Sequence, residues 1–271
     1  MKDLSQKYPI WLSDIWGVVH NGVGPFPTAV QALVNHRHNG GKVILISNAP
    51  TISPHVISQL DQLGVDPNAY DAVVTSGDAT RELIIKFGGG KIFHIGTERD
   101  YPLYQGLAVT RVPLDEATSV VCSGLFDELT ETADDYLQLL ADIKKRDLVM
   151  ICANPDTVVQ KGARLLPCAG AVAEVFTNMG GKVLMAGKPH TAIYELATAK
   201  AQNVWGAVIS KSQILAIGDG PATDIQGAAD FGVACVFVTG GINSGDDIIG
   251  SVKKAVPHAQ ILKTMDELDW N

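Results

Sequence analysis

Short runs of apolar residues alternate along most of the chain with segments in which apolar residues recur every three or four positions. The short runs are typical of buried strands, and the periodic segments are typical of helices that present one apolar face. Their alternation predicts a mostly parallel sheet covered by helices, and therefore an α/β fold. The predicted strands span residues 11–15, 43–46, 72–75, 92–95, 148–152, 214–217 and 233–238.

The predicted helices are less sharply bounded than the strands. Ser53 and Pro54 are typical of a helix start, with serine as the N-cap and proline at the first helical position. Helix-period apolar stripes occupy residues 56–63, 136–143, 172–179 and 193–197. His36 and His38 lie in a further predicted helix and are expected to face solvent.

Composition and charge exclude several classes of protein. The 271 residues, 46% of them hydrophobic, can bury a core, and no apolar run reaches the roughly 18 residues of a membrane helix. We therefore expect neither secretion nor membrane insertion. With 21 Lys and Arg against 29 Asp and Glu, the chain would repel nucleic acid. The cysteines lack CxxC spacing, which indicates no zinc site or disulfide framework and fits a cytoplasmic location: Cys122, Cys152, Cys168 and Cys235.

Two predicted strands end in aspartates. Asp14 lies near the end of the first predicted strand, before a glycine-containing turn, and Asp219 follows the strand 214–217 between two glycines, with Asp224 five residues later. Ligands of open α/β sheets bind beyond the carboxyl ends of the strands, so both positions suit a site. Two such carboxylates can share one hard cation. Turn capping by Asp14 and helix N-capping by Asp224 are the structural alternatives.

Three further polar residues follow strand-like runs. Lys188 stands between Gly187 and Pro189, where a lysine can neutralise a phosphate and its attacking carboxylate, although a solvated surface lysine is the alternative. Ser47 and Asn48 follow the strand 43–46 and can hold phosphoryl oxygens by hydrogen bonds.

The positions of these residues predict how the domains are organised. All of them lie before about residue 50 or after about residue 185, which leaves the middle of the chain without candidate chemistry. This distribution predicts an insertion into a core formed by both ends. We assign residues 1–75 and 182–271 to the core, and residues 76–181 to an inserted α/β cap domain.

The order of the motifs, strand-Asp, strand-Ser-Asn, Gly-Lys-Pro and strand-Gly-Asp, resembles the haloacid dehalogenase (HAD) superfamily. Within it, the chain is similar to subfamily IIA, which includes NagD-like sugar phosphatases and pyridoxal phosphate and phosphoglycolate phosphatases. The resemblance implies a Rossmann-like parallel-sheet core and extends over nearly the whole chain through these further matches: Thr75-Ser76-Gly77, Asn154-Pro155-Asp156, Leu165-Leu166-Pro167-Cys168-Ala169-Gly170 and Val238-Thr239-Gly240.

The resemblance also implies roles for the candidate residues. Asp14 would be the nucleophile that forms an aspartyl phosphate, and Lys188 would balance the developing charge. Ser47 and Asn48 would position the phosphoryl group of the substrate. The metal ligands for Mg²⁺ would be Asp14, the main-chain carbonyl of Trp16 and Asp219, with Asp224 in support.

The same resemblance assigns specificity to the cap. The cap would close over the site and select the leaving group, and it would also serve as the contact of a homodimer. The resemblance implies a small phosphate ester as the ligand, but the sequence does not identify which one, because the cap has cations that suit many anionic esters: Arg99, Arg111, Lys161 and Arg164.

One position departs from the family pattern. The family has Asp-x-Asp at the first motif, where the second aspartate protonates the leaving oxygen, whereas this chain has Asp14-Ile15-Trp16. The indole N–H cannot transfer protons near neutral pH, so we expect slow turnover. His20 is either a replacement acid and base or a bystander in an exposed turn.

Three functions follow from these observations. The leading hypothesis is a Mg²⁺-dependent phosphatase acting on a small phosphorylated metabolite. The alternative, favoured by Trp16, is a catalytically silent protein that binds a phosphate ligand for regulation. A nucleotide-binding oxidoreductase ranks far behind, because no GxGxxG motif follows the first strand.

Overall fold

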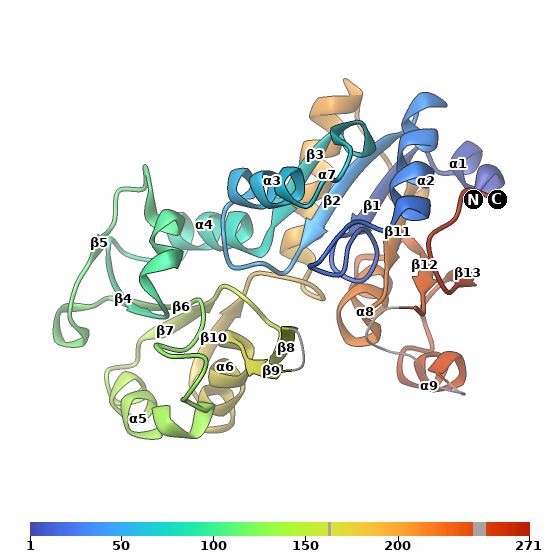
Figure 1. Cartoon of the computed structure of the whole chain (residues 1–271). Helices are drawn as coiled ribbons and strands as arrows, with labels where there is room; N and C mark the ends of the chain where they lie inside the picture. Colours follow the sequence, from blue (N-terminus) through green and yellow to red (C-terminus); the bar gives the residue numbers. More distant parts are fainter. Residues whose placement is uncertain (162–163, 241–247) are drawn as a thin grey trace. The chain divides into compact units, whose positions relative to one another are not determined.

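The computed structural model describes residues 1–161, 164–240 and 248–271 (Figure 1). By its internal contacts the chain divides into two compact units. The first unit comprises Met1–Ser47, Pro54–Val74 and Lys188–Asn271, and the second comprises Asn48–Ser53 and Thr75–Gly187. No helix in the described ranges is both long and apolar enough to span a membrane.

The first unit is built on a six-stranded sheet in the order β13-β12-β11-β1-β2-β3. Strand β1 pairs in parallel with both β11 and β2, and β12 pairs in parallel with β11 and β13. Every residue of β1, β11 and β12 is buried, as expected of parallel strands covered on both faces. The strands are β1 (Ile10–Asp14), β2 (Lys42–Ser47), β3 (Ala72–Thr75), β11 (Ile214–Gly218), β12 (Ala234–Val238) and β13 (Ile261–Met265).

Helices alternate along the chain with the strands of this sheet. Pro27 opens α2, and glycines in the left-handed conformation, Gly206 and Gly232, end α7 and α8. The helices are α1 (Lys2–Lys7), α2 (Pro27–His38), α3 (Ser53–Gln62), α7 (Thr191–Trp205), α8 (Gln226–Phe231) and α9 (Ile248–Ala255). Shorter helical turns are η1 (Pro67–Ala69), η5 (Lys211–Gln213) and the π-helical η6 (Pro221–Ile225).

The second unit has its own five-stranded parallel sheet in the order β10-β7-β6-β4-β5, together with the antiparallel hairpin β8-β9. Along β6, Val120 and Cys122 join one buried cluster and Val121 joins another, so this sheet separates two cores. The strands are β4 (Lys91–Ile95), β5 (Thr110–Arg111), β6 (Ser119–Cys122), β7 (Val149–Cys152), β8 (Val158–Lys161), β9 (Arg164–Pro167) and β10 (Lys182–Met185).

The helices of the second unit complete its layers. Thr75 begins α4 with a capping box, in which its hydroxyl accepts from Asp78 N and the Asp78 carboxylate accepts from Thr75 N. The helices are α4 (Ser76–Phe87), α5 (Leu137–Lys145) and α6 (Ala169–Asn178), with the shorter turns η2 (Glu98–Tyr104), η3 (Leu114–Glu116) and η4 (Ala133–Tyr136).

The predicted α/β class with a parallel, Rossmann-like sheet is confirmed. The predicted division at residues 181 and 182 differs from the contacts, because β10 pairs with β7 in the second sheet. The Gly180-Gly181 pair is a turn between α6 and β10 and not a border between units. The roles of the two units as core and cap, and the homodimer, stay predictions.

The expectation that His36 faces solvent is wrong, whereas His38 is exposed. The His36 ring stacks on Trp11 with centroids 3.8 Å apart, and its nitrogens contact Ser5 Oγ and the Pro9 carbonyl. Burial lowers the pKa of His36 to about 4, so this histidine is a neutral core residue.

Candidate active site

Strands β1 and β11 bring two aspartates together that are far apart in the sequence. Asp14 is the last residue of β1 and Asp219 directly follows β11, while the parallel register places Ser13 beside Ile217. Both carboxylates therefore emerge at the same edge of the sheet. Asp224 joins them from η6, and carboxylate oxygens of the three buried aspartates lie within 4.8 Å of one another.

Lys188 completes this arrangement. Its Nζ donates to Asp14 Oδ1 at 2.5 Å and to Asp224 Oδ1 at 2.8 Å, and the side chain is only 3% exposed. Burial opposes the charge of this ammonium, but Asp14 and Asp224 outweigh that effect and raise the pKa of Lys188. Lys188 is thus a charged lysine inside the protein and not a surface residue. We call Asp14, Lys188, Asp219 and Asp224 the aspartate–lysine cluster.

The aspartate–lysine cluster contains more negative than positive charge, with three carboxylates around one ammonium. Burial, together with repulsion from Asp224, raises the pKa of Asp14 well above its usual value, although Lys188 acts in the opposite direction. An additional cation would relieve this repulsion. Because the donors are carboxylate oxygens, the chemistry of the site fits a hard divalent ion such as Mg²⁺.

Glycines allow the backbone to approach these carboxylates closely. Gly17 has φ +82°, and a Cβ there would overlap the Asp219 carboxylate. A Cβ on Gly218 would similarly overlap Asp224, whose Oδ2 accepts from Gly220 N at 3.0 Å. Any side chain at 17 or 218 would push the carboxylates apart. Asp224 is not a helix N-cap, since Gly220 precedes η6 and Ile225 precedes α8.

Trp16 and His20 lie in the loop that follows Asp14, where an isolated parallel bridge joins them. Gly17 N donates to the His20 carbonyl, and Trp16 meets the His20 ring edge-on with centroids 5.3 Å apart. His20 Nδ1 accepts from Gly22 N at 3.0 Å, which places the proton of the neutral ring on Nε2. Burial lowers the pKa of His20. Both observations favour a structural role in this loop over a replacement acid.

The two predicted phosphate-positioning residues differ in their surroundings. Ser47 ends β2 beside β1, where Ile46 pairs with Asp14, and therefore stands at the same sheet edge as Asp14. Asn48 belongs to the second unit, and its Nδ2 donates to Asp156 Oδ1 at 2.9 Å. The structure thus ties Asn48 to the Asn154-Pro155-Asp156 segment.

Tyr194 is a site residue that the sequence analysis did not identify. Its hydroxyl donates to the Asp224 carbonyl at 3.3 Å, and the side chain is completely buried on α7. It lies within the apolar stripe predicted for that helix, where a tyrosine is usual core material, so no sequence signal distinguished it.

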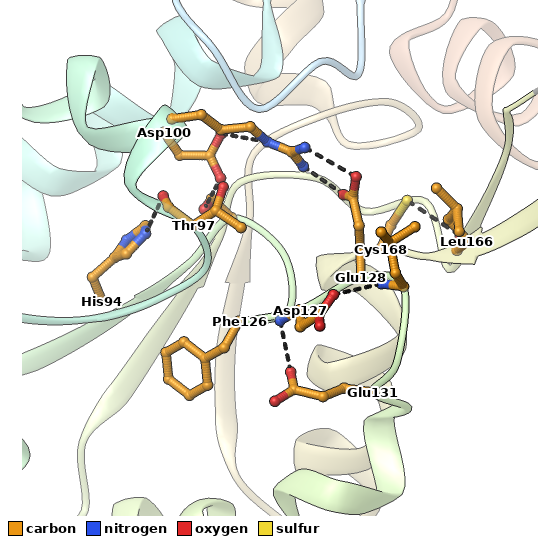
Figure 2. Close-up of polar contacts among 12 residues, drawn as sticks. His94, Thr97, Asp100, Phe126, Asp127, Glu128, Glu131, Leu166 and Cys168 are labelled. Carbon is orange, nitrogen blue, oxygen red and sulfur yellow. Dashed lines mark hydrogen bonds and ion pairs between the residues drawn. The ribbon is translucent and has the colours of Figure 1, made fainter.

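A second polar cluster lies within the second unit (Figure 2). Arg99 donates to both Glu128 oxygens, at 3.0 and 2.5 Å, and Ser123 Oγ donates to the buried Asp100 at 2.6 Å. We call Arg99, Asp100, Ser123 and Glu128 the arginine–glutamate cluster. Because Arg99 is paired with protein carboxylates, it is a weaker candidate for an anion contact than its sequence position indicated.

The other predicted cap cations give little further support for an anion contact. The Arg111 guanidinium lies over the Tyr101 ring, 3.2 Å from its centroid, in a cation–π contact. Arg164 is exposed at the start of β9, and the side chain of Lys161 lies outside the described residues.

Comparison with known proteins identifies the family. Residues 11–108 match the model described as haloacid dehalogenase-like hydrolase, and residues 185–268 match the HAD-hydrolase-like model. A crystal structure of a hydrolase of the haloacid dehalogenase-like family from Brucella suis 1330 is 44% identical, with TM-score 0.89, covering 99% of this chain and 98% of that one. The chain belongs to the haloacid dehalogenase-like hydrolase family.

Other HAD relatives are named as phosphatases. An acid sugar phosphatase from Staphylococcus epidermidis is 26% identical, covering 90% of this chain and 91% of its own length. A crystal structure of glycerol phosphate phosphatase from Mycobacterium tuberculosis in complex with magnesium is 26% identical, with TM-score 0.74, covering 96% of this chain and 75% of that one. The predictions of a HAD protein of the subfamily IIA type and of a hydrolase are confirmed.

Proposed function

We propose that this HAD protein is a Mg²⁺-dependent phosphatase that hydrolyses small phosphate monoesters through Asp14. The observation that carries the proposal is the buried aspartate–lysine cluster at the carboxyl edge of the first sheet, in which three carboxylates lie within 4.8 Å of one another. Such an excess of buried negative charge is costly to folding and is typical of a functional site. The phosphatase names of the relatives support the same reaction.

Asp14 is suited to attack phosphorus. Within the described residues, both hydrogen bonds to its carboxylate go to Oδ1, one from Lys188 Nζ and one from Ile15 N at 2.7 Å. We therefore assign the attack to Oδ2. A bond forms between Oδ2 and phosphorus while the bond from phosphorus to the leaving oxygen breaks, and the electron pair goes to that oxygen. Water then cleaves the aspartyl phosphate, which releases phosphate and restores Asp14.

The remaining residues position charge around this reaction. Lys188 faces Asp14 and Asp224, where it offsets negative charge as the phosphoryl group transfers. We assign the Mg²⁺ ligands to Asp14, the main-chain carbonyl of Trp16 and Asp219, with Asp224 in support; the ion supplies the positive charge that the cluster lacks. Ser47, at the same sheet edge, is our candidate donor to the phosphoryl oxygens, and Asn48 keeps that role as a prediction.

Trp16 limits the rate in this proposal. With tryptophan at the position of the usual acid, the leaving oxygen takes its proton from water, and the aspartyl phosphate loses its general base. Turnover should be slow for alkyl esters and faster for aryl esters, whose leaving groups need little protonation. The same substitution favours a second candidate, a protein that binds a phosphate ligand without turning it over.

A phosphate-release screen separates these two candidates. We expect the purified protein with Mg²⁺ to release phosphate from phenyl phosphate, and to stop when EDTA removes the metal. Orthophosphate should also raise the melting temperature in the presence of Mg²⁺, because it binds only the folded chain. Stabilisation by orthophosphate without release from any ester would establish the silent binding protein. If the protein shows neither phosphate release nor stabilisation by orthophosphate, both candidates are refuted.

A further inference from the structure

Trp16 is an unusual side chain for its position. It is 37% exposed, although its neighbours Ile15, Val18 and Val19 are at most 2% exposed. A large indole that remains accessible beside a buried polar site gains little for folding, because the apolar effect scales with the area removed from water. The exposed part of the indole is therefore available for contact with a ligand.

The backbone on both sides of Trp16 is tied to the aspartate–lysine cluster. Two residues before it, Asp14 belongs to that cluster. One residue after it, Gly17 lies so close to Asp219 that a Cβ would overlap the carboxylate. The main chain of Trp16 thus lies between two residues that approach carboxylates of the proposed site, so its side chain begins beside that site.

The indole is also held in place. A Cβ on Gly22 would overlap Cη2 of Trp16, so the far end of the ring lies against the Gly22 backbone. The His20 ring contacts it edge-on, and His20 is itself fixed by the hydrogen bond from Gly22 N. A ring fixed before a ligand arrives loses little freedom on binding, which makes it an effective stacking surface.

We infer that Trp16 is a specificity-determining residue that stacks on a planar aromatic group of the substrate, so that this site prefers phosphate esters of aromatic alcohols over those of aliphatic alcohols. The inference rests on the proposed phosphate site. Aromatic rings prefer offset-stacked or edge-to-face contacts, which a saturated ring of the same carbon count cannot reproduce. Aryl esters are also the ones that need least help with the leaving proton, so recognition and chemistry select the same substrates.

The test compares non-hydrolysable ligands, so that slow turnover cannot hide binding. Methylphosphonate, phenylphosphonate and cyclohexylphosphonate are titrated into the Mg²⁺-loaded protein by calorimetry. We expect all three to bind, and phenylphosphonate to bind about tenfold more tightly than cyclohexylphosphonate, a difference of about 1.4 kcal/mol.

Two variants assign this preference to the ring of residue 16. Trp16→Leu should reduce the ratio of the cyclohexylphosphonate to the phenylphosphonate dissociation constant to below about twofold, whereas Trp16→Phe should keep part of the preference. A merely structural role of Trp16 in its loop would alter all three affinities together.

The outcomes separate the inference from the proposed function. If methylphosphonate does not bind, the phosphate site fails and the inference fails with it. If methylphosphonate binds but the parent does not distinguish phenyl from cyclohexyl, only the inference is overturned, and this result needs no variant to fold. A preference that persists in Trp16→Leu would also overturn it.

Discussion

The two polar clusters of this protein differ in how far a cation offsets their carboxylates. In the arginine–glutamate cluster, Arg99 offsets Glu128 through two hydrogen bonds, and Asp100 accepts from Ser123. The aspartate–lysine cluster has one ammonium, bonded to Asp14 and Asp224, for three buried carboxylates, and repulsion adds to burial in raising the pKa of Asp14. The arginine–glutamate cluster has one guanidinium for two carboxylates, so the larger excess of negative charge lies in the aspartate–lysine cluster and favours a bound cation there.

The strongest way to break this comparison is to remove the nucleophile. Asp14→Asn keeps the size of the side chain but weakens it as a nucleophile, so phosphate release from phenyl phosphate should fall by roughly 10³ to 10⁶-fold. A coupled phosphate assay measures the loss. Asp115→Asn, the same change at an exposed position, is the control and should match the parent. Equal activity of Asp14→Asn and parent would move the chemistry away from this cluster.

Adding a carboxylate beside the aspartate–lysine cluster should increase activity, whereas removing the nucleophile should decrease it. Trp16→Asp supplies the missing acid and base, and should raise steady-state turnover of an alkyl phosphate by up to about 10² to 10⁴-fold. Stopped-flow kinetics should show a burst of aspartyl phosphate formation in the parent that disappears in the variant. His20→Ala tests His20 as the replacement acid and base. Because its Nδ1 already accepts from Gly22 N, we expect a small effect on turnover. A large loss would make His20 the proton carrier after all.

Lowering the pH should reduce the stability of both units, whereas Mg²⁺ should act on the first unit, which contains the aspartate–lysine cluster. His36 in the first unit and His94 in the second both have a pKa lowered by burial to about 4, against 6.5 when unfolded. The unfolded chain binds protons first, so stability falls as pH drops from about 6.5 towards 4, by up to about 3 kcal/mol for each histidine. Urea unfolding across this range measures the loss. His36→Gln should flatten the dependence, and an unchanged profile would contradict the neutral buried state.

The smallest expected effect compares one charge removed from each cluster. Without metal, Asp219→Asn should raise the free energy of unfolding by about 1 to 2 kcal/mol, because it relieves repulsion among buried carboxylates. Glu128→Gln, the matched change in the arginine–glutamate cluster, should lower it by less than about 1 kcal/mol, since Arg99 is 56% exposed.

Saturating Mg²⁺ should reverse the difference in stability between Asp219→Asn and the parent. The parent and Glu128→Gln gain stability from the ion, whereas Asp219→Asn gains little. Urea unfolding in EDTA and in Mg²⁺ gives both comparisons. Mg²⁺ binding by Asp219→Asn that is as tight as in the parent would show that our metal assignment is wrong.

The sequence predicted the central strands well because they are buried on both faces and read as uninterrupted apolar runs. The predicted run 43–46 lies within β2, and 214–217 lies within β11. It missed β13, an edge strand with mixed exposure, and β6, a short run within the second unit. Nothing in a strand-length pattern shows which sheet a strand joins, which is why the boundary at 182 was misplaced around β10.

The candidate site was predictable where the residue type itself carries the chemistry. Asp14, Lys188, Asp219 and Asp224 were identified from strand ends and glycines, and the structure brings them together. Tyr194 was not identified, since its role depends on a hydrogen bond to a main-chain carbonyl that no motif records.

The pairing of β1 with β11 has a consequence for how the protein is made. Ile10 lies beside Ile214, and β1 is flanked by β2 on its other edge, so one central strand pairs with segments made early and late. At about 5 to 20 residues per second, a ribosome needs roughly 10 to 40 s to deliver the second partner. During that time one apolar edge of β1 is unpaired on the nascent chain, while the second unit, encoded in between, has time to fold first. We expect synthesis at high temperature to depend on chaperones that hold this edge until β11 emerges.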